Sequence, residues 1–132
     1  MSASESGPQG EPANRIIAMP ADANPSGDIF GGWIMSMMDM AGGTTAYRRA
    51  GGRVATVAVE TIEFHRPVTI GDEVSCYTEV LRVGRTSIAV RVDVWVRSMR
   101  DGVPVKVTSG VFTFVALDAN KRPRPVDQPP AA

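Results

Sequence analysis

The chain has 132 residues, of which 43% are hydrophobic, and this length and composition suit one globular domain. Its 14 basic and 14 acidic residues balance, which argues against nucleic acid or an acidic membrane as a partner. Cys76 is the only cysteine and His65 the only histidine, which excludes an internal disulfide and a structural zinc site. No apolar run reaches the roughly 18 residues of a membrane span, and the polar first residues differ from a secretory signal. We expect a cytoplasmic protein without a metal.

Six of the ten prolines lie near the two ends of the chain, among Ser, Gly, Gln and Ala. Such a composition is typical of segments that do not join a packed core. We therefore expect mobile tails over residues 1–13 and 123–132, with one domain over residues 14–122 between them.

The first half of the domain is expected to contain one short strand and one long helix. The strand is expected from Arg15 to Met19, and a loop of turn-forming residues follows from Pro20 to Gly27. The helix is expected from about Phe30 to Arg49, where Ser26 or Asp28 can cap its start.

Apolar residues surround the axis in the first half of this helix: Trp33, Ile34, Met35, Met37, Met38, Met40 and Ala41. A helix of this kind is expected to be buried on every side. It nevertheless holds one carboxylate, Asp39, whose lost hydration must be replaced by hydrogen bonds, a counter-charge or admitted water. Asp39 is therefore either satisfied structurally or faces a site.

Two pairs of glycines mark the second half of the helix. Glycine inside a helix costs about 1 kcal/mol against alanine, so Gly42-Gly43 indicates the close approach of a backbone, a ligand or a packed sheet. Gly51-Gly52 is expected to end the helix.

After the helix the periodicity changes to two, and β-branched residues fill four segments: Val54 to Phe64, Glu73 to Val83, Thr86 to Met99 and Val103 to Leu117. Short turns between them make antiparallel pairing in chain order the simplest assembly. The sequence predicts an α+β fold, in which an antiparallel sheet of about five strands wraps one long central helix. Because one curved sheet covers only part of a helix, we expect a second copy to cover the rest, as a dimer.

Several motifs occur in order along residues 15–126: Ala18-Met19-Pro20, the run from Asn24 to Trp33, Met38-Asp39, the run from Phe64 to Val68, and Gly84-Arg85-Thr86-Ser87. Together they resemble the hotdog-fold acyl-CoA thioesterases of the YciA and brain acyl-CoA hydrolase type. The resemblance implies hydrolysis of acyl-CoA to free CoA and a carboxylic acid, with CoA as part of the substrate and no separate cofactor. It also implies a homodimer with sites at the subunit interface, often assembled as a trimer of dimers.

The catalytic groups that the resemblance implies begin with Asp39, which matches the catalytic acid of the family. Asp39 is expected to act as a general base on water or as a nucleophile that forms a mixed anhydride, and both routes stay open. Asn24 matches a loop asparagine that brain-type enzymes use as a second catalytic group. The backbone N–H groups of Gly31 and Gly32, unpaired within the helix and at its positive end, suit a developing oxyanion. Since Gly32 and Asp39 are roughly 10 Å apart along the axis, we expect Asp39 of one chain to work with the loop of the other.

The CoA phosphates are expected to need cations near the mouth of a channel. Arg82 and Arg85 are one candidate pair, because a guanidinium can bind two phosphate oxygens. Between and after them, the backbone of Gly84, Arg85, Thr86 and Ser87 can bond the pantetheine arm. Lys121, Arg122 and Arg124 form a second candidate cluster. Phe30, Trp33 and the methionines are candidates for the acyl pocket.

Each of these residues also has a simpler structural interpretation. Asp39 can be a satisfied buried carboxylate, Asn24 an ordinary turn residue, and the two glycines sites of close packing. His65 and Cys76 are expected to be core or interface residues. Two other functions are the alternatives. A hotdog hydratase or dehydratase generally needs a histidine near the helix, and the absence of any histidine before His65 argues against it. A module that binds acyl-CoA without turnover is the second, and the presence of Asp39 together with Asn24 argues against it.

Overall fold

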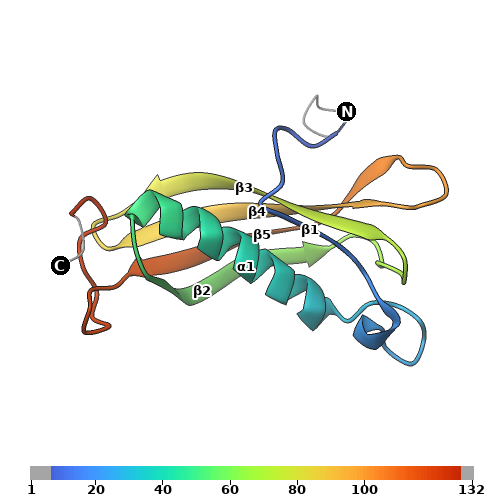
Figure 1. Ribbon diagram of the computed structural model, residues 1–132, viewed down its shortest axis with the longest axis horizontal. Coiled ribbons are helices and arrows are strands. Elements are labelled where there is room, and N and C mark those ends of the chain that lie inside the picture. The colour runs from blue at the N-terminus through green and yellow to red at the C-terminus, as the bar shows by residue number, and fades with distance from the viewer. Residues whose placement is uncertain (1–6, 129–132) are drawn as a thin grey trace.

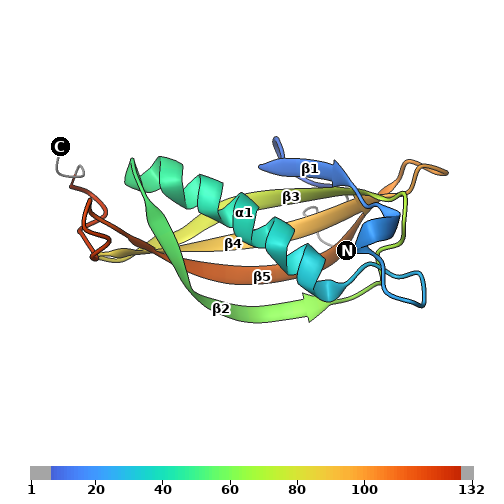
Figure 2. The same cartoon turned by 60° about the horizontal axis from the view of Figure 1, so that its bottom comes forward.

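One antiparallel sheet and one long helix make up the fold of residues 7–128, the part of the chain that the computed structural model describes. The elements in chain order are β1 (Asn14–Ile17), the short 3-10 helix η2 (Pro20–Asp22), α1 (Gly31–Ala50), β2 (Val54–Phe64), β3 (Glu73–Val83), β4 (Ser87–Arg97) and β5 (Pro104–Ala116). The five strands follow the order β1-β3-β4-β5-β2, and α1 runs across one face of the sheet (Figure 1 and Figure 2). The α+β architecture expected from the sequence is confirmed.

The pairing of β2 differs from the expected chain order. Strands β3, β4 and β5 pair in sequence, but β2 pairs with β5 and β1 pairs with β3. The connection from β2 to β3 is not a tight hairpin, because the Val68 carbonyl accepts a 2.8 Å hydrogen bond from the Ile29 N–H and Thr69 pairs with Asp28. This connection reaches across the sheet, so β2 becomes an edge strand.

The core lies between α1 and the middle strands. The inward side of α1 buries apolar residues at helical spacing: Ile34, Met37, Met38, Ala41, Ala46 and Ala50. A Cβ added to Gly42 would lie 3.1 Å from the Phe114 ring and 3.3 Å from Val92. The sequence left a backbone, a ligand or a packed sheet as the reason for the glycine pair, and at Gly42 the reason is the packed sheet. Cys76 is also in the core, where burial raises the pKa of its thiol to about 12.

The outward side of α1 is not covered within the single chain, so the expectation of burial on every side is wrong for one protomer. Met40 is 56% exposed, and Met35 and Tyr47 are also exposed. The reason is geometric, because the sheet reaches only one side of the helix (Figure 2). The helix ends as expected at Gly51, which has φ 67° and donates its N–H to the Tyr47 carbonyl.

The start of α1 differs from the expectation in one detail. Phe30 occupies the N-cap position and makes no side-chain capping bond, so neither Ser26 nor Asp28 caps the helix. Their backbone N–H groups instead donate to the side chain of Asn24. The first amides of the helix are therefore left without a side-chain cap.

The described parts of the two expected tails pack against the domain. The Ala13 N–H donates to the Cys76 carbonyl at 2.8 Å, and Arg124 and Val126 are buried. The expected domain boundary at residue 123 therefore falls too early. Residues 1–6 and 129–132 of the expected tails lie outside the described residues. Within residues 7–128, α1 is too polar to cross a membrane and η2 is too short.

Candidate active site

Asp39 lies in the middle of α1, half-buried, and faces the edge strand β2. The Thr56 hydroxyl on β2 donates a hydrogen bond of 2.6 Å to Oδ1 of Asp39. Hydrogen bonds to ionised groups are stronger than those between neutral groups, so this contact orients the carboxylate. Sequence reasoning missed Thr56. The only signal for it is a single hydroxyl within the otherwise apolar run from Val54 to Val59.

The amino-terminal end of α1 presents backbone donors to the surface. Gly31 and Gly32 are exposed, and within residues 7–128 neither N–H makes a hydrogen bond, whereas the Trp33 N–H already donates to the Phe30 carbonyl at 3.1 Å. The ring of Phe64 lies close by, 3.5 Å from where a Cβ of Gly31 would stand. Free amides at the positive end of a helix suit a negatively charged oxygen.

A hollow of about 310 Å³ lies next to these amides. Its floor is apolar and buried, formed by Ile29, Ile34 and Val68. Polar side chains line its rim, including Asp28, His65 and Arg66. The arrangement joins an apolar floor to the helix start, as a small ligand site requires.

Asn24 lies in the loop before α1, and its side-chain oxygen is occupied. It accepts hydrogen bonds from the Ser26 N–H at 2.9 Å and the Asp28 N–H at 3.1 Å, which is an Asx-type turn. Asn24 therefore acts as a turn residue through its side-chain oxygen. Its side-chain NH₂ group remains available to contact a ligand.

The structure brings Asp39 together with Thr56 but not with the helix start of the same chain. Asp39 is about two helical turns beyond Gly31 and Gly32, and the loop that carries Asn24 lies still further along, beyond the start of α1 (Figure 2). One chain therefore holds two groups of candidate residues that are separated along the helix.

The turn from Gly84 to Ser87 lies at the opposite end of the molecule, near the carboxyl end of α1 (Figure 1). Arg82 and Arg85 are exposed there. The backbone of the turn is partly engaged, since the Gly84 N–H donates to the Ser87 carbonyl and the Thr86 carbonyl accepts from the Ala116 N–H. The two arginine side chains are thus presented on a turn that the fold holds.

The second cation cluster divides in the structure. Lys121 and Arg122 are exposed, whereas Arg124 is buried and its guanidinium donates to backbone carbonyl groups. Arg124 is therefore engaged in the fold and is not presented to an anion.

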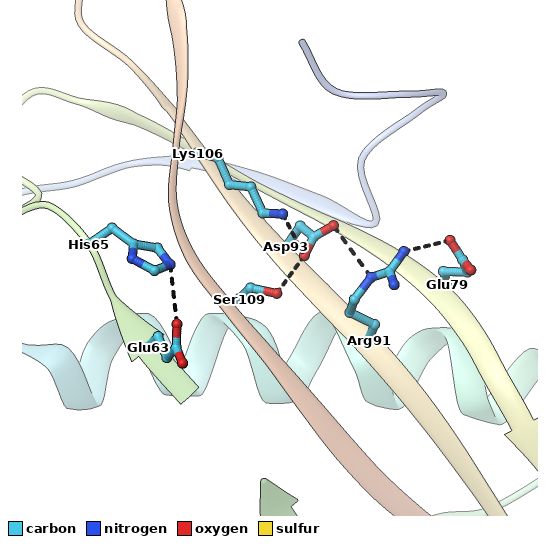
Figure 3. Close-up of polar contacts among 7 residues, drawn as sticks. All are labelled: Glu63, His65, Glu79, Arg91, Asp93, Lys106 and Ser109. Carbon is cyan, nitrogen blue, oxygen red and sulfur yellow. Dashed lines mark hydrogen bonds and ion pairs between the residues drawn. The ribbon is translucent and has the colours of Figure 1, made fainter. Parts of the chain in front are cut away.

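His65 is exposed, so it is not the core residue that the sequence allowed. Its Nε2 lies 3.8 Å from a carboxylate oxygen of Glu63 (Figure 3). The other polar side chains in Figure 3 come from β3, β4 and β5, and Asp93 lies at their centre, with the Ser109 hydroxyl donating to it at 2.7 Å. Neither Asp39 nor Thr56 takes part in this network. Within the described part of the chain, no three side chains of His, Cys, Asp or Glu are grouped as a metal site.

Comparison with known families gives one match, to the thioesterase superfamily, over residues 26–103. This range begins in the loop before α1 and ends just before β5. It includes Asp39, Thr56 and the turn from Gly84 to Ser87, so the match covers most of the positions described above.

Similar proteins support the same assignment. The acyl-CoA thioester hydrolase YciA of Salmonella typhimurium is 46% identical over 129 residues, which are 96% of this chain and 97% of that protein. The solved structure of HI0827, a hexameric broad-specificity acyl-coenzyme A thioesterase, is 50% identical with a TM-score of 0.85, covering 92% of this chain and 84% of that one. Cj0915, a hexameric hotdog-fold thioesterase of Campylobacter jejuni, is 41% identical with a TM-score of 0.83, covering 88% and 90%.

Proposed function

We propose how the residues of this chain hydrolyse acyl-CoA to free CoA and a carboxylic acid, starting from its family. The chain belongs to the thioesterase superfamily and is a hotdog-fold acyl-CoA thioester hydrolase of the YciA type. The observation that carries the proposal is the Thr56–Asp39 hydrogen bond, which holds a carboxylate in the exposed seam between α1 and β2. The only other reactant is water, and we propose that no cofactor takes part.

In the proposed reaction Asp39 accepts a proton from water as the water oxygen bonds to the thioester carbonyl carbon. The negative charge then develops on the carbonyl oxygen, and the free N–H groups of Gly31 and Gly32 stabilise it. When the C–S bond breaks, the CoA sulfur leaves and takes up the proton that Asp39 held. The amide of Asn24 is proposed to orient the water or the thioester.

The alternative route, attack by Asp39 itself, forms a mixed anhydride and is testable with isotopic water. A single turnover in ¹⁸O-labelled water labels Asp39 if water opens the anhydride at the Asp39 carbonyl carbon, and acid quenching during the turnover traps an acylated Asp39 peptide if water attacks the acyl carbon instead. Direct attack by water leaves Asp39 neither labelled nor acylated in peptide mass spectrometry, which is the outcome we expect. Label in the peptide that contains Asp39 would establish the nucleophilic route.

The active form is proposed to be a homo-oligomer in which two chains complete each site. Asp39 and Gly32 of one chain are roughly 10 Å apart along α1, so one thioester cannot easily reach both groups of the same chain. The seam next to Asp39 also exposes apolar side chains that a second copy can cover, among them Met40 at 56% and Val57 at 58%. We propose a dimer as the unit, assembled as a trimer of dimers, which the hexameric relatives support.

Shared sites can be tested by complementation. Asp39→Asn and Gly32→Pro each remove one half-site, and a mixture of the two inactive proteins, unfolded and refolded together, should regain part of the activity. Each variant refolded alone is the control. Recovery in the mixture supports sites built from two chains, whereas no recovery in mixed oligomers identified by mass would show that each chain holds its own site.

The nucleotide end of CoA is proposed to lie at the carboxyl end of α1. From Asp39 to Ala50 the helix rises about 17 Å, a span comparable to an extended pantetheine arm. Arg82 and Arg85 lie at that end, as do Lys121 and Arg122, and their charges suit the phosphates. The backbone of Gly84, Thr86 and Ser87 is proposed to contact the arm. Double replacement of Arg82 and Arg85 by Ala should raise KM for acyl-CoA.

The function itself is tested with a panel of acyl-CoAs from acetyl to palmitoyl, by following release of free thiol. Asp39→Asn should lower kcat by about two orders of magnitude or more. The matched control is Asp101→Asn, in the exposed turn between β4 and β5, which should retain activity. Acyl-CoA binding without turnover by the wild type would replace this proposal with a binding module.

A further inference from the structure

Residues 117–128, called here the C-terminal latch, pack onto the end of the molecule where α1 stops. The Leu117 N–H donates to the Arg53 carbonyl at 2.9 Å, and the Arg124 N–H donates to the Ala116 carbonyl at 2.9 Å. Val126 is 3% exposed and belongs to the hydrophobic core. Figure 1 shows this segment beside the carboxyl end of α1 and the turn between β3 and β4.

Arg124 is the centre of the latch and is only 5% exposed. Its Nη2 donates to the Ala50 carbonyl at 2.8 Å and its Nε to the Leu117 carbonyl at 3.1 Å. Its Nη1 donates to the carbonyls of Pro125 and Gln128. Among the described residues no carboxylate lies within ion-pair distance, so backbone carbonyls and the negative end of α1 compensate the buried charge. Arg124 thereby ties the helix end, the end of β5 and the latch together.

The latch also holds the turn that carries Arg85. The Val126 N–H donates to the Arg85 carbonyl at 2.8 Å, and Ala116, which pairs with the latch, donates its N–H to the Thr86 carbonyl. The Arg85 side chain is exposed, so this backbone anchoring determines where its guanidinium can reach. The surface pair between Arg49 and Asp127, at 2.9 Å, joins the latch to α1 a second time.

We propose that the C-terminal latch positions the turn from Gly84 to Ser87 for the nucleotide end of the substrate, with Arg124 as a positioning residue. This inference rests on the proposed function, because it concerns the CoA end of the same site. Ordering a turn before binding removes a cost that binding would otherwise carry. Since Asp39 lies about 17 Å from the end of α1, loosening the latch should change substrate affinity and leave the chemical step intact.

The test compares two substrates that share one acyl group. Butyryl-CoA carries the nucleotide, whereas the butyryl thioester of N-acetylcysteamine ends before the phosphates. Arg124→Gln should raise KM for butyryl-CoA about tenfold, with kcat within a factor of about two and kcat/KM for the short thioester unchanged. Arg124→Lys keeps the charge and should recover part of the affinity. Val126→Ala is a milder variant that should move KM in the same direction.

The matched control is Val74→Ala, a fully buried position at the opposite end of β3 from the turn. It should lower thermal stability without changing KM, which separates positioning from a general loss of stability. Equal losses on both substrates, or an unchanged KM for butyryl-CoA in folded Arg124→Gln and Val126→Ala, would overturn the proposal.

Binding of CoA itself, measured by calorimetry, separates this inference from the proposed function. If the wild type binds CoA but hydrolyses neither thioester, the proposed function fails, and the ratio of CoA dissociation constants between Arg124→Gln and wild type still decides the role of the latch. If the wild type neither binds CoA nor hydrolyses butyryl-CoA, both proposals fail.

Discussion

The Thr56 hydroxyl donates a hydrogen bond of 2.6 Å to the Asp39 carboxylate, and within residues 7–128 this is the only side-chain hydrogen bond that joins α1 to β2. It engages Oδ1, and within the same residues no protein group donates to Oδ2. A carboxylate fixed by one oxygen and open at the other is well arranged to accept a proton from water.

Removal of the Thr56 hydroxyl should reduce catalysis without removing the carboxylate. A hydrogen bond to a charged group contributes about 1.5–3 kcal/mol, so Thr56→Val is expected to lower kcat/KM by roughly tenfold or more. Steady-state hydrolysis of one acyl-CoA measures this. Thr56→Ser keeps the hydroxyl and should stay close to wild type, and wild-type activity in Thr56→Val would contradict this role of the hydroxyl.

The two neighbouring glycines of α1 should respond in opposite ways to alanine. A Cβ at Gly42 would stand 3.1 Å from the Phe114 ring, tighter than ordinary contact, so Gly42→Ala should destabilise the fold by about 1–3 kcal/mol. At Gly43 the same ring would be 3.6 Å away, so Gly43→Ala should gain up to about 1 kcal/mol from helix propensity. Urea unfolding of both variants measures the difference. A common sign for the two changes would contradict the packing described here.

Strain at Thr61 should be relieved by a residue that tolerates positive φ. Thr61 has φ 54°, at a shift in register between Glu60 and Glu63 where β2 bends. A β-branched residue in this conformation costs roughly 1 kcal/mol or more, so Thr61→Asn is expected to raise the midpoint of thermal unfolding. Thr113→Asn, on β5 and not among the residues with positive φ, is the comparison and should lower the midpoint because asparagine fits a strand poorly.

Acid should weaken the C-terminal latch through Asp118. The hydrogen bond from the Arg122 N–H, with further help from the Asn120 N–H and the charges of Arg122 and Arg124, outweighs desolvation and lowers the pKa of Asp118 from its ordinary value of 3.8. A carboxyl with a lower pKa in the folded chain adds stability above its unfolded pKa and loses it as pH falls through the folded value.

Replacement of Asp118 by Ala should therefore destabilise the protein at neutral pH, and its difference in unfolding free energy from wild type should shrink below pH 3.8. Urea unfolding at a series of pH values measures this. Asp118→Asn keeps an acceptor but cannot ionise, so its difference from wild type should be smaller at neutral pH and should also shrink in acid. A difference that stays constant through the acid range would contradict the linkage.

Local patterns predicted the elements well and their pairing less well. Alternation in β4 places Val90, Val92 and Val94 in the core, as the structure confirms, because side chains on a strand must alternate between faces. Local patterns do not predict the pairing of β2 with β5, because it joins residues far apart in sequence, such as Val54 and Ala116. No local period can reveal such a contact.

A site residue can be predicted from the sequence where its type is rare among its neighbours. It is harder to predict where tertiary contacts decide its role. A carboxylate in an apolar helix singled out Asp39. Thr56 became visible only when β2 was placed beside α1, since threonine is ordinary in a strand. Arg124 was grouped with exposed cations by sequence proximity, whereas the fold buries it against Ala50.

The position of the core strands in the chain has a consequence for biosynthesis. The surface of α1 at Gly42 is packed by Val92 and Phe114, on strands β4 and β5 near the end of the sequence. A ribosome therefore releases the methionine-rich helix long before the strands that cover it exist. During that interval the nascent chain exposes an apolar segment of the kind that chaperones retain, and the fold closes only when β5 has emerged.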